Sequence, residues 1–262
     1  MAGSGAFPAL ALAEARKKGY SCFVAGIFGE AEASLKENTE EFEWVGIGEI
    51  LKLITFFKKH QVQEVLFAGK VSPQALYQKV NFNATSSEFL SQIKDKSPTV
   101  LLKAVIDFLA QQEIKVLDPT IFLIPYFCPE GILTDKKPAV KVLEDVLYGW
   151  EIARAIADLD IGQTVAVKDK AVVAVEGIEG TDEAIQRAGI LAGKGVVVIK
   201  VSRSSQDPRI DLPAVGLGTV RALVQAGGAA LCLEAGKVLF FQKDEAISLA
   251  NASGLALIAR KA

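Results

Sequence analysis

The chain has 262 residues, half of them hydrophobic, and a mean hydropathy of +0.30. This length allows one large domain or two ordinary ones, and we expect two. The net charge is −2 with both signs interspersed, which argues against nucleic-acid binding because no basic tract or aromatic platform is present. No apolar run reaches the roughly 18 residues of a membrane span, so we expect a soluble protein.

Histidine and cysteine usage narrows the possible chemistry. The single histidine, His60, lies at the end of the helical run 49–61, where a capping role is expected. Cys22, Cys128 and Cys232 are odd in number, far apart and in apolar contexts, which predicts reduced core thiols in a cytoplasmic protein. Catalysis would therefore use carboxylates, Lys, Arg, hydroxyls and a hard metal, because a zinc site or a Ser-His-Asp triad needs imidazoles.

Strand and helix patterns alternate in the first half of the chain. Pro8 and Gly19 mark the ends of the first predicted helix. The predicted helices span 9–18, 50–59 and 97–111, and the predicted strands span 20–27, 62–67 and 114–117. We therefore predict a Rossmann-like parallel α/β domain over residues 1–130.

Turn residues and charges over 131–145 predict a linker, followed by a second domain over 146–262. A long amphipathic helix is expected over 139–159, and Lys168-Asp-Lys170 predicts the turn of a hairpin. Further helices are expected from Gly180 and over 219–226 and 244–252, and strands over 196–201, 231–234, 238–241 and 255–258. This pattern predicts an α+β fold with a mixed sheet.

Two polar segments follow predicted strands of the second domain. The segment 175–182 carries Glu176 and Glu179 before a helix whose N-cap is predicted to be Thr181 or Asp182. The segment 200–216 carries two aspartates, two arginines and Lys200. Such groups at strand ends suit a Mg²⁺-bridged diphosphate, since the metal takes carboxylate and phosphate oxygens. The alternatives are a structural salt-bridge cluster and solvated turns capped by aspartates.

Glycines also open the chain, at Gly3 and Gly5 before Pro8. Glycines at a helix start allow backbone N–H groups to approach an anion, whereas a flexible terminus is the alternative. The pattern lacks the preceding strand of a dinucleotide-binding fingerprint.

Several blocks resemble the LpxI family, the UDP-2,3-diacylglucosamine pyrophosphatases of lipid A biosynthesis. The resemblance spans essentially the whole chain, and its most specific blocks are Glu-Gly-Ile-Glu-Gly-Thr-Asp at 176–182 and Gln-Asp-Pro-Arg-Ile-Asp-Leu-Pro at 206–213. The other blocks lie at 2–8, 44–48, 68–71, 160–163 and 228–236.

The resemblance implies a Mg²⁺-dependent hydrolase that cleaves UDP-2,3-diacylglucosamine to UMP and 2,3-diacylglucosamine 1-phosphate (lipid X). It also implies a homodimer that holds its substrate between two domains and works in the cytoplasm, with peripheral contact at the inner membrane left open. The apolar composition would then serve two acyl chains, or simply a core. The alternative functions are a nucleotide-sugar or lipid binding protein without catalysis, and an interaction scaffold.

The resemblance also implies the site residues. Asp207 and Asp211 would bind metal or activate water, in an order that we leave open, with Glu176 as a further ligand or base and Arg209 on phosphate oxygens. The substrate-binding residues would be Gly3, Ser4, Gly5, Gly69, Glu179, Thr181, Asp182, Lys200 and Gln206.

One feature departs from the family pattern, in which a hydrophobic strand precedes the Ala-Gly-x-Gly loop. Here Met1 stands almost where that strand should end. Two interpretations stay open: the start of the chain was assigned late, or the first domain lacks a strand.

Overall fold

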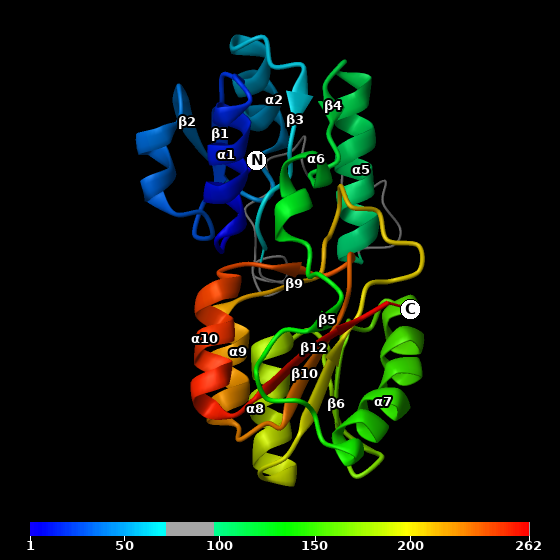
Figure 1. Cartoon of the computed structure of the whole chain (residues 1–262). Helices are drawn as coiled ribbons and strands as arrows, with labels where there is room; N and C mark the ends of the chain where they lie inside the picture. Colours follow the sequence, from blue (N-terminus) through cyan, green and yellow to red (C-terminus); the bar gives the residue numbers. More distant parts are fainter. Residues whose placement is uncertain (72–96, 262) are drawn as a thin grey trace. The chain divides into compact units, whose positions relative to one another are not determined.

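A computed structural model describes residues 1–71 and 97–261, which form two compact units (Figure 1). The first unit comprises Met1–Leu123 and Pro208–Ile210, and the second comprises Ile124–Asp207 and Asp211–Ala262. Residues 131–145, predicted as a linker, hold strand β5 (Gly131–Ile132) and the start of helix α7 (Val140–Asp158). Both units mix helices and strands, as predicted.

Within its described residues, the first unit holds its strands as two parallel pairs. Strand β1 (Phe23–Ile27) pairs with β2 (Glu41–Val45), and β3 (Glu64–Val65) pairs with β4 (Lys115–Val116). The helices of this unit are α1 (Phe7–Lys17), 3-10 helix η1 (Ala33–Asn38), α2 (Ile50–Lys59), α5 (Pro98–Gln111) and α6 (Thr120–Leu123). These elements follow the predicted alternation, with shorter strands.

The amphipathic pattern of α2 explains how this unit packs. Leu53, Phe56 and Phe57 lie on one side of the helix and are at most 5% exposed. They belong to the same buried cluster as Val65 of β3 and Val116 of β4. The helix ends at its C-cap His60, which confirms the expected capping position.

The chain's first residues lie between the two strand pairs. Ala2 forms one parallel β-bridge with Gly26 and another with Ala68. Its N–H donates to the carbonyl of Ala25 at 2.8 Å, and its own carbonyl accepts from the N–H of Ile27 at 2.9 Å. Ala2 thus bridges the two strand pairs within the described residues.

The second unit is built on a six-stranded mixed sheet in the order β5-β12-β10-β8-β6-β7. Strands β8, β10 and β12 are parallel, whereas β5 and β6 run antiparallel to their partners and β6 forms a hairpin with β7. The bounds are β6 (Thr164–Lys168), β7 (Ala171–Val175), β8 (Val197–Lys200), β10 (Ala230–Glu234) and β12 (Ala256–Arg260). The predicted mixed sheet is confirmed.

Helices cover both faces of this sheet (Figure 1). One face carries α8 (Thr181–Ala192), α9 (Leu217–Gln225) and α10 (Lys243–Ser253), and the other carries α7. The run of valines in β8 suits this position, because Val198 packs in the cluster of α8 to α10, and Val197 and Ile199 pack in that of α7. All three are 0% exposed.

Outside the main sheet, the second unit holds a short parallel pair and a 3-10 turn. The pair is β9 (Ala214–Val215) with β11 (Leu239–Phe240), and the 3-10 helix is η2 (Ile124–Tyr126).

Cys128 and Cys232 are buried free thiols, as predicted, whereas Cys22 is half-buried. Burial raises the pKa of both buried thiols to about 12, so they stay protonated and unreactive at neutral pH.

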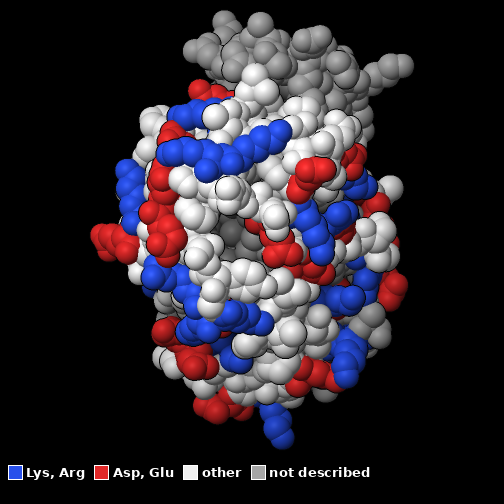
Figure 2. Space-filling model, turned by 90° about the horizontal axis from the view of Figure 1, so that it is seen from above, with Lys and Arg blue, Asp and Glu red and all other residues white. Residues whose placement is uncertain are grey.

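Within residues 1–71 and 97–261, no helix has the length and apolar character to cross a membrane. Acidic and basic side chains are interspersed over the face shown in Figure 2, in keeping with the small net charge.

A buried carboxylate on α7 holds the hairpin turn of the sheet. Asp169 and Lys170 both have positive φ, 54° and 56°, as a two-residue hairpin loop of this type requires. Their N–H groups donate to the carboxylate of Asp145 at 3.0 and 2.7 Å, and Asp145 is 3% exposed. The turn is therefore anchored to the helix that covers the sheet.

The variant Asp145→Ala should lower the free energy of unfolding by about 2 kcal/mol, because it leaves two turn N–H groups without their acceptor. Its neighbour provides the control: Glu144 forms an exposed ion pair with Lys170, so Glu144→Ala should cost less than about 1 kcal/mol. Urea unfolding of both variants measures the difference. Equal losses would show that Asp145 does not anchor the turn.

Candidate active site

A buried lysine lies where strands β6, β7 and β8 meet at one edge of the second unit's sheet. Lys200 is the last residue of β8, and it pairs with Thr164, the first residue of antiparallel β6. Its Nζ donates to the hydroxyl of Thr164 at 3.1 Å and to that of Thr181 at 2.8 Å. The same Nζ lies 3.5 Å from Oε2 of Glu176, which directly follows β7. Lys200 is 5% exposed.

Glu176 accepts hydrogen bonds on both oxygens. The hydroxyl of Thr181 donates to Oε1 at 2.7 Å, and the backbone N–H of Gln163 donates to Oε2 at 3.2 Å. Burial by itself would raise the pKa of Glu176, but the Lys200 charge and the bonds from Thr164, Thr181 and Gln163 outweigh it and lower the pKa to about 2. The carboxylate is therefore ionised throughout the physiological pH range.

These contacts make Glu176 and Lys200 part of the framework of the sheet edge. A carboxylate with so low a pKa is a weak general base, because proton transfer is best driven by a group titrating near the working pH. Lys200 has three donors, and the two hydroxyls and the carboxylate account for them. The pair fixes the ends of three strands and the start of α8.

Gln163 connects this buried pair to an exposed carboxylate. Its side-chain Nε2 donates to Oδ2 of Asp211 at 2.6 Å, while its backbone bonds Glu176. Gln206 donates to the same Oδ2 at 3.3 Å and to the Asp211 carbonyl at 2.7 Å, and Arg203 lies 3.8 Å from Oδ2. The Asp211 side chain is 45% exposed, so it is open to a ligand.

The other polar atom of the Gln163 side chain, Oε1, is buried and has no hydrogen-bond partner among the described residues. The amide orientation is fixed, because turning it over would place Oε1 against the Asp211 carboxylate. An unpaired buried acceptor costs about 1–3 kcal/mol, so a donor or a cation is expected beside it.

Sequence reasoning did not select Gln163 or Thr164 as site residues, and it named Arg203 only as one of the two arginines of the segment 200–216. The block Asp160-Ile-Gly-Gln163 was a signal for the first, and the structure explains its glycine. A Cβ on Gly162 would lie 2.1 Å from the carbonyl oxygen of Glu176, so the loop can approach Glu176 only without a side chain there.

Two predicted residues of the same segment bond elsewhere. Glu179 accepts from the N–H of Gly177 at 3.1 Å and forms an ion pair with Arg187 on α8. Asp182 accepts from the hydroxyl of Thr219 at 2.8 Å.

The prediction that Thr181 or Asp182 is the N-cap of α8 was wrong. The N-cap is Gly180, at φ 92°, so Thr181 begins the helix instead and its hydroxyl joins the Lys200 cluster.

The Asp211 N–H donates to the Asp207 carbonyl at 3.3 Å, so these two residues of the second unit close a tight turn. Arg209 lies inside that turn, in the segment Pro208–Ile210 that belongs to the first unit. Ile210 packs against the cluster that contains Phe57.

The predicted glycine residues lie together in the first unit. Gly3 and Ser4 run beside Gly69, and Ser4 exchanges backbone hydrogen bonds with Lys70 at 2.7 and 3.0 Å. A Cβ on Gly3 would lie 2.2 Å from the Lys70 carbonyl oxygen, and one on Gly69 would lie 2.6 Å from the Ser4 carbonyl oxygen. Gly5 has φ 91°, which favours glycine. The loop is thus close-packed.

Among the described residues, no group of three or more His, Cys, Asp or Glu side chains could hold a metal. Mg²⁺ usually needs only one or two carboxylates, with waters and substrate phosphates as its other ligands. The exposed carboxylate of Asp211 and the unpaired Oε1 of Gln163 are hard oxygen donors that fit this pattern. Asp207 lies in the same turn.

The fold and these clusters define a two-unit α/β protein with a polar site at a sheet edge. The LpxI N-terminal domain model matches residues 1–125, and the LpxI C-terminal domain model matches residues 129–258. The chain is also 28% identical over 266 residues to "UDP-2,3-diacylglucosamine pyrophosphatase LpxI" from Caulobacter vibrioides, covering 97% of this chain and 94% of the relative. The chain belongs to the LpxI family.

The variant Glu176→Gln should lower the free energy of unfolding by about 3 kcal/mol at pH 7, because it leaves the Lys200 charge buried without its partner. The pKa of Glu176 is depressed in the fold, so its stabilising effect is present above pH 4.5 and is lost as the pH falls toward 2. Urea unfolding at pH 7 and pH 3 should show the gap between wild type and variant shrinking at the lower pH.

The matched control is Glu179→Gln, which removes a more exposed ion pair and should cost less than about 1 kcal/mol. A gap for Glu176→Gln that stays constant between pH 7 and pH 3 would rule out the charge of Glu176 as its source.

Proposed function

We propose that this chain hydrolyses the diphosphate bond of UDP-2,3-diacylglucosamine, releasing UMP and 2,3-diacylglucosamine 1-phosphate. The observation that carries the proposal is the match of both LpxI domain models, supported by the nearly full-length similarity to a relative with that activity in its name. The polar site supports the same chemistry, since it offers hard oxygen ligands and cations to a diphosphate.

The proposed roles of the site residues follow from their exposure. Glu176, Lys200, Thr164 and Thr181 hold the sheet edge in shape, because their polar groups already satisfy one another. Asp211 has an exposed carboxylate held by Gln163, Gln206 and Arg203, so it is the acid available to a ligand.

Mg²⁺ would be held by Asp211, with Asp207 and Oε1 of Gln163 as further oxygen donors. When bound, the cation would neutralise charge on the phosphate oxygens. Arg203 lies within reach of Asp211 and would add positive charge beside the same phosphates. Arg209 is proposed to hold phosphate oxygens. The glycine loop of the first unit would receive part of the substrate, so that both units contribute to binding.

The assay measures UMP release from UDP-2,3-diacylglucosamine by purified protein, with Mg²⁺ and with a chelator. We expect turnover only with Mg²⁺, and a fall in kcat of at least about 100-fold for Asp211→Asn, because loss of a group that binds metal or activates water typically has effects of this size. The control Glu245→Gln changes an exposed carboxylate on α10 and should leave kcat unchanged.

The same assay tests the first unit. Gly69→Ala should raise KM with little change in kcat, because its Cβ would collide with the Ser4 carbonyl and distort the loop. A protein that binds the UDP-lipid and releases no UMP under any of these conditions would be a binding protein, and the proposed activity would be wrong.

We also propose that the chain forms a homodimer through α7. Val140, Leu143 and Leu147 recur at helical spacing on this helix and are 75%, 41% and 59% exposed, which is unusual for an apolar stripe facing water.

Leu147→Asp should therefore convert the dimer to a monomer, since it places a charge in the apolar contact. Ala155→Asp adds the same charge at an exposed position of α7 beyond the stripe and should leave the dimer intact. Size-exclusion chromatography with light scattering measures both masses. A monomeric wild-type protein would contradict the proposal.

A further inference from the structure

An exposed aromatic ring stands at the carboxyl end of β1 in the first unit. Phe28 directly follows this buried strand and is 73% exposed. Its ring contacts Trp44 of β2 in a T-shaped arrangement, with the ring centroids 6.0 Å apart and the planes at 79°. Such a contact uses one edge or one face of a ring, so at least one face of Phe28 stays open. An open aromatic face of fixed orientation is suited to stacking.

The ring continues an aromatic row on one face of β2. Phe42 lies two residues before Trp44 and therefore faces the same side of the strand, and their ring centroids are 4.8 Å apart. Gly26 on the neighbouring strand leaves room for this row, because a Cβ there would lie 2.4 Å from Cζ of Phe42. The row is thus close-packed, and Phe28 extends it to the edge of the sheet.

A lysine lies over the aromatic row. The Nζ of Lys36, in η1, is 5.3 Å from the ring centroids of both Phe42 and Trp44. This distance is within the range of a cation–π contact. No carboxylate in the described part of the chain pairs with Lys36. Because the row already holds one cation, a second cation is disfavoured beside it and an anionic ligand is attracted.

The strand register places the exposed ring at the same edge as the glycine loop, residues 3–5. Gly26 pairs in parallel with Trp44 of β2 and with Ala2. Ala2 in turn bridges in parallel to Ala68. Because all these pairings are parallel, the residues two positions further along their strands lie at one carboxyl edge, where open α/β sheets bind ligands. These edge residues are Phe28, Ser4 and Lys70.

The edge offers groups for both parts of a nucleotide. The hydroxyl of Ser4 donates to the carbonyl of Lys70 at 3.0 Å, which keeps Lys70 beside the glycine loop. The Lys70 side chain is exposed and has no ion-pair partner within residues 1–71 and 97–261. Phe28 and Lys70 are two strand spacings apart, about 10 Å at the backbone. This separation is comparable with the length of a nucleoside diphosphate from its base to its second phosphate.

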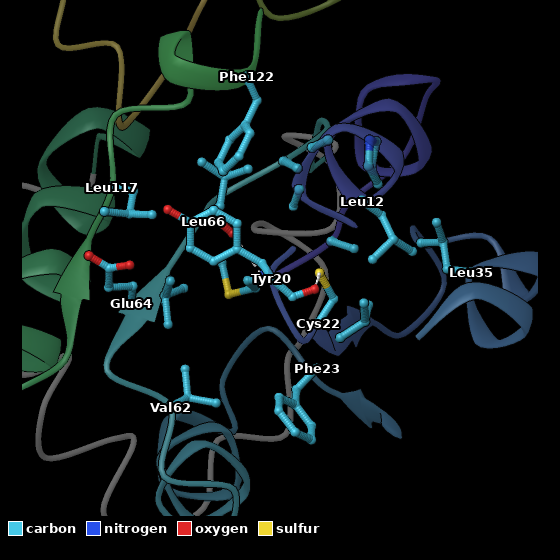
Figure 3. Close-up of a pocket in the computed structure, with 18 of the residues that line it drawn as sticks. Leu12, Tyr20, Cys22, Phe23, Leu35, Val62, Glu64, Leu66, Leu117 and Phe122 are labelled. Atoms are coloured by element: carbon cyan, nitrogen blue, oxygen red, sulfur yellow. Dashed lines mark hydrogen bonds between the residues drawn. The ribbon is translucent and has the colours of Figure 1, made fainter. Parts of the chain in front are cut away.

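The pocket shown in Figure 3 has a different chemistry. It lies in the same unit and is lined mainly by apolar side chains, including Leu12, Phe23 and Leu66. No lysine or arginine is among the described residues that line it. A phosphate there would lose its hydration without gaining a cation. A nucleotide is therefore expected at the carboxyl edge and not in this pocket.

We propose that Phe28 is the stacking platform for the base of a nucleotide whose phosphates are bound by the glycine loop and Lys70. Stacking requires only a π face, so the site itself accepts any base. The choice of uracil as the base, and of UMP as the probe, rests on the proposed function. Phe28 thus adds affinity through the base, whereas Lys70 acts on the phosphate charge.

The test measures the affinity of the full-length protein for UMP and for ribose 5-phosphate, which lacks the base, by isothermal titration calorimetry. UMP should bind the more tightly. Phe28→Ala should weaken UMP binding at least about fivefold, the effect of losing one stacked base, and leave ribose 5-phosphate binding unchanged. Phe28→Tyr keeps the ring and should restore the affinity for UMP. Lys70→Gln should weaken both ligands by the same factor.

The matched control is Tyr20→Ala, which removes another exposed aromatic ring of the same unit. Tyr20 is 46% exposed, and its ring contacts Phe122 instead of the aromatic row. This variant should leave the affinity for UMP unchanged. Equal affinities of the wild-type protein for UMP and ribose 5-phosphate would overturn the proposal. A loss of UMP binding in Tyr20→Ala as large as in Phe28→Ala would overturn it as well.

Two tryptophans allow NMR to locate the nucleotide. Trp44 contacts Phe28, whereas Trp150 is buried on α7 of the second unit. UMP should shift the indole N–H signal of Trp44 in the wild-type protein and in Phe28→Tyr, and should not shift it in Phe28→Ala. A shift of the Trp150 signal alone would place the nucleotide on the second unit and overturn the proposal.

These measurements do not depend on hydrolysis, so the two proposals can fail separately. A wild-type protein that binds UMP through Phe28 but releases none from the UDP-lipid would overturn the proposed function alone. A wild-type protein that releases UMP, with an affinity for UMP that Phe28→Ala leaves unchanged, would overturn the stacking site alone.

Discussion

A buried ion pair between Lys200 and Glu176 determines the shape of the sheet edge in the second unit. Removing two charges from water costs several kcal/mol, and only good geometry and further hydrogen bonds offset that cost. Thr164 and Thr181 supply those bonds on both sides of the pair. Because the four residues come from β6, β8, α8 and the end of β7, the cluster ties these elements together at one point.

The exposed polar groups of this region lie farther out than the buried pair. Glu176 has a pKa of about 2 and accepts bonds on both oxygens, so it stays ionised at neutral pH and its carboxylate is held in place. Asp211 differs because nearly half of its side chain is exposed, yet Gln163 and Gln206 fix its orientation. Gln163 links the two carboxylates, and through it the rigidity of the buried pair reaches the exposed acid.

The periodicity of the sequence predicted most helices and strands, because Val196 to Ile199 and the apolar positions of α2 follow the pattern of their buried faces. The turn at Asp169 and Lys170 could also be predicted, because its sequence signal is local. The partners of Gln163, Thr164 and Arg203 could not be predicted, since neutral and basic polar residues are common on any surface. Lys200 was predicted to hold phosphate, and only its tertiary contacts show that Thr164, Thr181 and Glu176 surround it.

The two units position polar loops at strand ends by different physical means. In the second unit a buried charge fixes the edge, and the cost of its burial is offset by hydroxyls and a carboxylate. In the first unit the constraint is steric: Gly3 and Gly69 approach opposite backbone so closely that no Cβ fits between them. A close-packed glycine loop is only as rigid as the strand that carries it, because glycine itself adds backbone freedom. The rigidity of the glycine loop therefore depends on the hydrogen bonds around Ala2, whereas the sheet edge of the second unit depends on the ionisation of Glu176.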